Sequence, residues 1–221
     1  YNGNNVAPPV GRDFATRNVL LSFYGRGIFT IANKYIISAS IRRDGSSRFY
    51  NGTKDNVWGN FPGVSVGWKL NEESFLKGKG INTLKLRAGW GKTGNQELND
   101  NDYAASGSYN LSNGGAQYYL GDSFYQMYRP NIFNPNLTWE ITTTKNVGLD
   151  YGFAKNRIFG SIDLFQKTAD KLLVSGAPIA AGDVSNNNNL NVGVMDSKGI
   201  EGSITVVPIK TEDTTLELSF N

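Results

Sequence analysis

Cysteine and histidine are both missing from the 221 residues of this chain. Without cysteine the protein forms no disulfide and has no thiol chemistry, and without histidine it lacks the commonest metal ligand and general base. Zinc sites, Ser-His-Asp triads and Cys-His dyads are therefore excluded. No carboxylate pair is arranged for acid–base work, because Asp150 and Asp163 fall on predicted strands beside basic residues. We expect a protein that is not an enzyme.

Long apolar runs and a strong charge of one sign are missing too. No segment approaches the roughly 20 continuous apolar residues of a membrane helix. Lys and Arg number 22 against 19 Asp and Glu, and a net charge of +3 is too small to indicate nucleic-acid binding. The mean hydropathy of −0.37 still permits a membrane barrel, because a transmembrane strand exposes only every second residue to lipid.

Period-two alternation of apolar and polar residues runs through most of the chain and predicts β-strands. The predicted strands are 19–32, 35–43, 57–70, 82–92, 138–153, 157–167, 199–207 and 214–221. The joints alternate between short ones (33–34, 71–81, 154–156, 208–213) and long ones (44–56, 93–137, 168–198). Antiparallel strands with short turns at one end and long loops at the other are typical of outer-membrane barrels. The predicted fold class is therefore all-β: an antiparallel transmembrane β-barrel segment of about eight strands from a larger barrel.

The apolar face of these strands is predicted to contact lipid. The residues assigned to that face are Ile37, Leu86, Val147, Leu149 and Ile204. The opposite face combines glycines with Lys85, Arg87, Asp150 and Glu201, as a wide wet lumen requires. A water-soluble antiparallel sheet with one face on a core would give similar apolar rows, so that alternative stays open.

Three cations continue the apolar face toward the long-loop end: Arg43, Lys92 and Lys145. One explanation is that the strands extend beyond the membrane, where these cations are solvated. We also predict that they occupy one height and meet the anionic phosphates of lipopolysaccharide in the outer leaflet.

Two of the short joints carry recognisable turn residues. Asn33-Lys34 is predicted to form a two-residue hairpin loop, with Asn33 at positive φ. Residues 71–76 are predicted to form a single helical turn, because Asn71 is a capping residue and Glu72-Glu73 suit a first turn.

The long segment 93–137 is rich in tyrosine among Asn, Gly, Ser and Asp. Its rings and polar groups suit stacking against sugars or docking a protein partner; packing of the segment on itself is the alternative. The residues predicted to make contacts are Tyr103, Tyr109, Tyr118, Tyr119, Tyr125 and Tyr128. The run Asn186-Asn187-Asn188-Asn189 is predicted to be a loop tip. Four asparagines without carboxylates make a poor metal site, and Asp183 alone is weak evidence for calcium.

Several phrases of the sequence resemble the barrel of SusC/RagA-type TonB-dependent transporters. They are RRDGSSRF (42–49), WGNFPGVSVGWKLNEESFL (58–76), LKLRAGWGKTGNQEL (84–98), NPNLTWEITTTKNVGLDYGF (134–153), GSIDLFQKTADKLLV (160–174) and NVGVMDSKGIEGSI (191–204). The resemblance covers roughly residues 19–221 in order. Any one phrase is of modest specificity, but the combination is highly specific.

The resemblance implies a 22-stranded barrel of the Gram-negative outer membrane, closed by an N-terminal plug and importing bulky nutrients such as glycans or peptides. It implies energy from a TonB–ExbB–ExbD complex and a SusD-like surface lipoprotein over the mouth. The loop tyrosines and Trp139 would then be contacts at the mouth. We expect residues 1–221 to be a partial barrel, with the plug and the last strands absent from this chain.

Other functions remain open on the sequence. A passive porin, or a self-contained eight-stranded adhesin or anchor, would use the same strands, although the second must pair its first and last strands. A soluble carbohydrate-binding sandwich would suit the tyrosines but not the sorting of loops by length.

Overall fold

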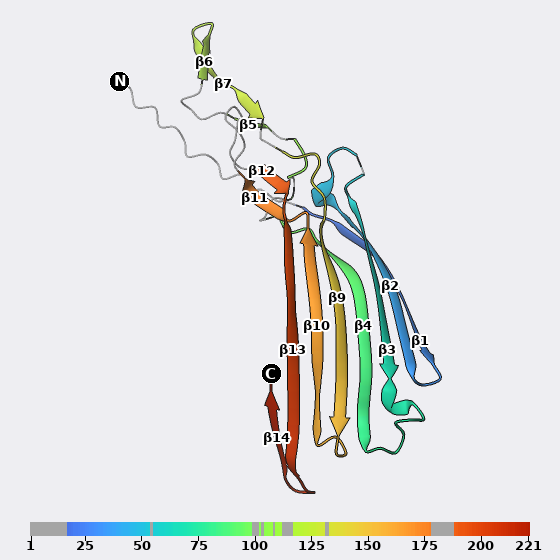
Figure 1. The fold of residues 1–221 in the computed structure, drawn as a ribbon. Helices are drawn as coiled ribbons and strands as arrows, with labels where there is room; N and C mark the ends of the chain where they lie inside the picture. The colour runs from blue at the N-terminus through green and yellow to red at the C-terminus, as the bar shows by residue number, and fades with distance from the viewer. Residues whose placement is uncertain are drawn as a thin grey trace.

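Eight long antiparallel strands form one sheet in the order β1-β2-β3-β4-β9-β10-β13-β14 (Figure 1). The computed structural model describes residues 17–53, 55–98, 102, 104–107, 109–111, 117–130, 133–177 and 188–221. The strands of this sheet are β1 (Leu20–Ile31), β2 (Tyr35–Ser46), β3 (Trp58–Lys69), β4 (Ile81–Asn95), β9 (Glu140–Phe153), β10 (Ile158–Asp170), β13 (Val194–Lys210) and the shorter β14 (Thr215–Phe220). Each predicted strand overlaps one of these, so the strand prediction is confirmed.

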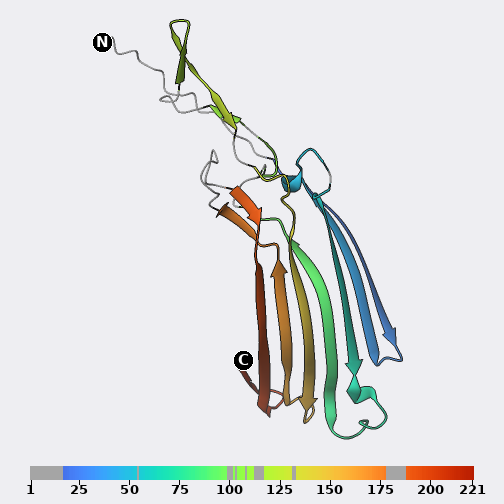
Figure 2. The same ribbon diagram turned by 45° about the horizontal axis from the view of Figure 1, so that its top comes forward.

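The sheet is a curved wall with two free edges in the part of the chain that the structure describes. Figure 2 shows the long strands bending together. There β1 pairs only with β2, and β14 pairs only with β13. These strands therefore do not close on themselves into the eight-stranded barrel that remained open on the sequence.

Loops are sorted by length between the two ends of the sheet, as predicted. One end carries the short turns and the 3₁₀ helix η2 (Leu70–Glu72). The other end carries η1 (Ser47–Phe49) and three small strand pairs: β5 (Tyr109–Leu111) with β8 (Tyr128–Pro130), β6 (Gln117–Leu120) with β7 (Ser123–Gln126), and β11 (Leu173–Ala177) with β12 (Asn188–Asn191). No helix in the described ranges is long and apolar enough to cross a membrane.

The register lines up alternate residues into rows across the wall. On one face Val66, Ala88, Val147, Leu164 and Ile200 form a row. On the other face the neighbouring row runs Gly67, Arg87, Gly148, Asp163 and Glu201. A sheet puts successive side chains on opposite faces, so one face of the wall is apolar and the other carries glycine and charge.

The two turn predictions are right in kind and wrong in detail. Asn33 has a φ of 56°, as expected, but Ala32 shares the left-handed region at 50°. Three residues separate the paired Ile31 and Tyr35, because Lys34 donates its amide to Ile31 O at 3.0 Å before the ladder begins. The loop therefore has three residues and not two.

The helical turn near residue 71 is present as η2, but Asn71 does not cap it. The turn begins at Leu70 with Lys69 at the N-cap position, where no side chain makes a capping bond. The Asn71 side-chain oxygen instead accepts the Leu84 amide at 3.3 Å and ties the turn to β4.

One carboxylate at the short-turn end joins three elements. Glu73 accepts hydrogen bonds from Lys34 Nζ at 2.8 Å and from Tyr35 Oη and Trp68 Nε1 at 3.0 Å each. The Tyr35 and Trp68 rings stack with centroids 6.1 Å apart. The bonds from Lys34, Trp68 and Tyr35 lower the pKa of Glu73 to about 2.

Replacing this carboxylate should cost stability in a pH-dependent way. In the unfolded chain Glu73 protonates near its ordinary pKa of 4.5, whereas in the folded chain it stays charged down to about 2. Its contribution is therefore present above pH 4.5 and is lost as the pH falls from 4.5 toward 2. We expect Glu73→Gln to lower the unfolding free energy of the full-length protein at neutral pH, and the difference from native to close over that acidic window in urea titrations. A difference that stays constant down to pH 2 would contradict this account.

Candidate ligand-binding mouth and barrel wall

A small buried cluster lies at the long-loop end of the sheet. Its members come from β2–β3, from the segment after β4 and from the segment before β9: Phe49, Phe61, Leu98, Ala104, Ala105, Leu137 and Trp139, with Ile141 and Leu173 packed against them. The cluster gathers three chain segments that are far apart in sequence. We call this cluster the base of the mouth, because the long loops are packed against it.

Trp139 is at the centre of this cluster and is only 3% exposed. Its ring lies 5.3 Å, centroid to centroid, from both Phe49 and Phe61. Its indole N–H donates to Val57 O at 3.0 Å. The sequence predicted that Trp139 would be a contact at the mouth together with the tyrosines. That prediction is wrong in placing Trp139 at the surface, because its ring is covered by the residues of the cluster.

A buried ion pair holds the segment after β4 to this base. Arg48 Nε lies 3.0 Å from Asp102 Oδ1, and the side chains of both residues are about nine-tenths buried. Arg48 Nη1 also donates to Gln96 O at 3.2 Å, and Asn18 donates to the same Asp102 oxygen at 3.1 Å. Sequence reading missed this pair, because no pattern links residues 54 positions apart.

The third long loop is attached to the same base by amide side chains. Asn191 accepts the Thr138 amide at 2.8 Å and donates to Thr138 O at 2.8 Å. Asn134 donates to Asn189 O at 3.1 Å. Asn188 and Asn189 belong to β12, so the prediction of a loop tip is wrong for these two; Asn186, Asn187 and Asp183 lie outside the described residues.

The predicted contact tyrosines lie above the base and are exposed. Tyr109 and Tyr128, on paired strands β5 and β8, are 69% and 70% exposed. The β6–β7 hairpin carries an aromatic pair on each face, Tyr118 with Tyr125 (centroids 5.9 Å apart) and Tyr119 with Phe124 (5.0 Å). Tyr103 lies outside the described residues.

Tyr119 is set as a hydrogen-bond donor at neutral pH. Its hydroxyl donates to Asp122 Oδ1 at 2.9 Å, and this bond raises the pKa of the phenol above its ordinary value. Exposed aromatic rings can stack on a sugar or fill a pocket of a partner protein. The contacts that they make with a ligand or partner stay predictions.

The polar face of the wall is crossed by one guanidinium that bridges two carboxylates. Arg87 Nη2 lies 2.8 Å from Asp150 Oδ1 and 2.9 Å from Asp163 Oδ1. Gly148 stands between Arg87 and Asp163 in the row, and a Cβ there would lie 2.8 Å from Arg87 Nη2 and run into the Asp163 carboxylate. The missing side chain is what allows Arg87 on β4 to cross β9 and reach β10.

The predicted lipid-facing side chains share the other face. Ile37, Leu86, Val147 and Ile204 are exposed, and Leu149 is half-buried between its row neighbours Leu86 and Ile162. No second layer of described residues covers Leu86, Val147 or Leu149. That they contact lipid stays a prediction, but the geometry leaves the face open to it.

The three outer-rim cations share that face by alternation, but they lie in different rows. The row of Lys145 crosses β4 at Trp90 and β2 at Ala39, so Lys92 is two residues and Arg43 four residues further along. Barrel strands tilt against the axis, so residues of one row lie at different heights in the membrane. That the three cations occupy one height therefore stays a prediction. Arg43 is held over the Trp58 ring at 5.0 Å, and Lys92 borders a crevice with Arg42, Asp44 and Phe61.

Comparison with known proteins identifies the wall. The sequence model of the family described as "TonB dependent receptor-like, beta-barrel" matches residues 1–221. The chain belongs to this family. It is 45% identical over 94% of its length to TonB-dependent receptor SusC of Bacteroides thetaiotaomicron, of which it covers 20%, and 40% identical over 94% to TonB-dependent receptor P39 of Formosa agariphila, of which it covers 19%. It thus spans about a fifth of these relatives.

Solved structures share the fold. The RagAB peptide importer in its open-open state matches 91% of the chain with a TM-score of 0.77 at 24% identity, and the chain covers 21% of it. The siderophore receptor PirA from Pseudomonas aeruginosa matches 91% with a TM-score of 0.55 at 16% identity, and the chain covers 34% of it. The wall is therefore part of an antiparallel β-barrel of the outer membrane, and the predicted fold class is confirmed.

Breaking the Arg87 bridge should destabilise the barrel wall. Arg87→Ala leaves Asp150 and Asp163 without their cation, with Glu201 opposite Asp163, and should cost about 2 kcal/mol because the groups are only partly buried. Gly148→Ala should cost a similar amount by displacing the guanidinium. Gly202→Ala is the matched control, because the atom nearest to a Cβ there is Ser161 O at 3.9 Å. Urea unfolding of the full-length protein measures all three; equal stability of the Gly148 and Gly202 variants would refute the bridge.

Trp139 should matter for the stability of the mouth and not for its surface. Trp139→Ala removes a fully packed ring, which costs about 3–5 kcal/mol. We expect amide hydrogen exchange in residues 44–57 and 133–139 to accelerate by about a hundredfold or more. Phe124→Ala, on the exposed hairpin, should leave those amides unchanged. Slow exchange in both variants would show that the cluster is not the base of the mouth.

Proposed function

We propose that this chain is the wall and mouth segment of a TonB-dependent transporter that actively imports bulky nutrients, glycan or peptide, across the outer membrane. The observation that carries the proposal is the 45% identity to SusC over nearly the whole chain, on a wall whose fold matches the RagAB peptide importer. Both the plug that closes the lumen and the further strands that complete the barrel would belong to the rest of the protein.

The shape of the segment supports transport through a lumen. Its polar face carries Lys85, Arg87, Asp150 and Glu201 together with glycines, which keeps a wide interior wet. In the part of the chain that the structure describes, β1 and β14 each have one edge without a paired strand, which hydrocarbon does not tolerate, so we expect further strands beside them. This favours a large barrel with room for a plug and a bulky cargo.

The mouth supports capture by a surface partner. Tyr109, Tyr118, Tyr119, Tyr125 and Tyr128 stand exposed above the base. Rings of this kind are enriched where proteins bind proteins. A SusD-like surface lipoprotein would close over them, and the TonB–ExbB–ExbD complex would act through the plug.

Uptake of a labelled oligosaccharide or peptide by cells carrying the full-length protein tests the proposal. Active import requires TonB, so uptake should fall to background when tonB is deleted and should saturate with cargo concentration. A passive porin, the second candidate, would keep importing without TonB. Uptake that survives the deletion therefore rejects active import and favours the porin.

The tyrosines should affect capture rather than folding. Tyr119→Ala and Tyr128→Ala should each weaken binding of the cargo or lipoprotein by roughly tenfold, because exposed rings that become buried on binding act as anchors. Isothermal titration on the full-length protein measures this. Phe75→Ala, an equally exposed ring at the short-turn end, is the control. Unchanged affinity in both tyrosine variants would remove the hairpins from the binding surface.

A further inference from the structure

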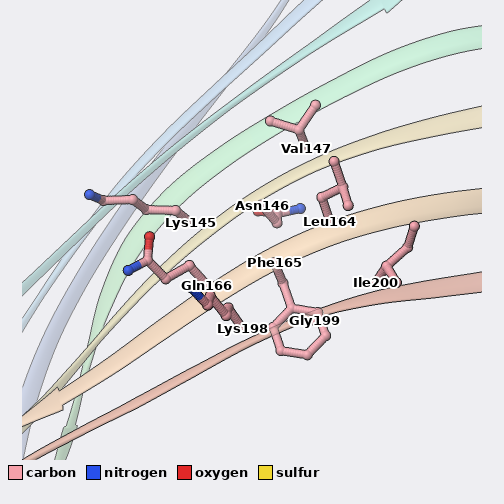
Figure 3. Close-up of a pocket in the computed structure, with 9 residues that line it drawn as sticks. All are labelled: Lys145, Asn146, Val147, Leu164, Phe165, Gln166, Lys198, Gly199 and Ile200. Atoms are coloured by element: carbon pink, nitrogen blue, oxygen red, sulfur yellow. The ribbon is translucent and has the colours of Figure 1, made fainter.

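A groove on the apolar face of the wall runs over β9, β10 and β13, and Figure 3 shows the residues that line it. Its volume is about 600 Å³. Six residues that line it belong to the outward face by alternation: Lys145, Val147, Leu164, Gln166, Lys198 and Ile200. Asn146, Phe165 and Gly199 complete the lining and alternate with them along the strands.

The floor of the groove is apolar and continuous. Val147, Leu164 and Ile200 are paired across the three strands and are 49%, 54% and 70% exposed. The next row toward the short turns holds Leu149, Ile162 and Gly202, so the apolar surface continues along the strands beyond the groove. The floor therefore suits an acyl chain lying along the strands.

The end of the groove nearer the long loops is cationic. Gln166 pairs with Lys145 on one side and Lys198 on the other, so two ammonium groups flank one amide. Within the described ranges neither lysine makes an ion pair. The nearest acid in the next row, Asp196, accepts the Thr168 hydroxyl at 2.6 Å. Trp90 stands beside Lys145 in the same row, as rings do at the level of lipid headgroups.

We propose that the groove is a binding site for one phosphorylated lipid of the outer leaflet, the lipid A part of lipopolysaccharide. A phosphate would bind Lys145, Gln166 and Lys198, and an acyl chain would lie over Val147, Leu164 and Ile200. The sequence predicted a set of outer-rim cations made of Arg43, Lys92 and Lys145. In the structure Lys145 lies near Lys198 instead, a residue that was not in that set.

Charge favours a lipid over a second copy of the chain. A two-fold contact on this face would bring each pair of lysines close to the same pair of its partner, with no acid to separate them. An anionic headgroup neutralises them instead. The inference rests on the place of the barrel in the outer membrane and not on import.

Native mass spectrometry of the delipidated full-length protein, titrated with bisphosphorylated lipid A, tests the site. We expect the protein to bind one lipid A tightly, and K145Q/K198Q to weaken that binding by about 25-fold, since each interfacial lysine contributes roughly fivefold. The matched control K69Q/K85Q removes two lysines that are paired across β3 and β4 on the polar face, and it should leave the affinity unchanged.

Three outcomes would overturn the proposal. They are equal affinity of the native protein and K145Q/K198Q, displacement of lipid A by millimolar inorganic phosphate, and a change from dimer to monomer in K145Q/K198Q with lipid binding intact. Leu164→Ser is a second test. Because it removes part of the apolar floor, it should weaken the binding of lipid A and leave the binding of inorganic phosphate unchanged. Uptake by K145Q/K198Q should match native uptake, so a failure of import and a failure of this site are distinguishable.

Discussion

Hydrocarbon offers no partner to a backbone amide, and this constraint shapes the whole wall. Every N–H and C=O that crosses the membrane must bond to a neighbouring strand, so the chain pairs eight long strands without a crossover. Alternation then follows from the pleat: what faces acyl chains must be apolar, and what faces the lumen is free to be glycine or charged. The rows Val147–Leu164–Ile200 and Gly148–Asp163–Glu201 are two neighbouring rows of the same pairing.

The candidate functional residues lie in three regions where side chains need not be apolar: the long-loop end, the lumen face and the boundary of the apolar rows. At the long-loop end the backbone is in water, and a packed cluster around Trp139 with the Arg48–Asp102 pair supports exposed tyrosines. On the lumen face, Arg87 spans three strands because Gly148 leaves the space. On the outer face, at the boundary of the apolar rows, Lys145 and Lys198 mark a groove suited to an anionic lipid. The tyrosines, the Arg87 bridge and the two lysines all lie at positions where the membrane does not require an apolar side chain.

The strands and the sorting of loops were predictable because period-two alternation is a local signal with little noise here. Positive φ at Asn33 was also predictable, but the third residue of its loop was not, since that depends on where the β2 ladder begins. Trp139 was misplaced at the surface because its burial depends on Phe49 and Phe61, which are 90 and 78 positions away. The Arg87 bridge and the pairing of Lys145 with Lys198 need the register between strands, which no single strand contains. Sequence therefore specifies which face a residue takes, and pairing specifies which residues meet on it.

The direction of the two faces is the claim on which all else depends, and nitroxide scanning of the full-length barrel in bilayers measures it directly. Single labels at Val147 and Leu164 should collide with lipid-soluble oxygen, whereas labels at Asn146 and Ser161 should collide with a water-soluble nickel chelate. Adjacent positions 146 and 147 should thus give opposite results. If Val147 and Leu164 are instead shielded from oxygen, or all four labels respond to nickel, the wall does not face lipid and the account is wrong.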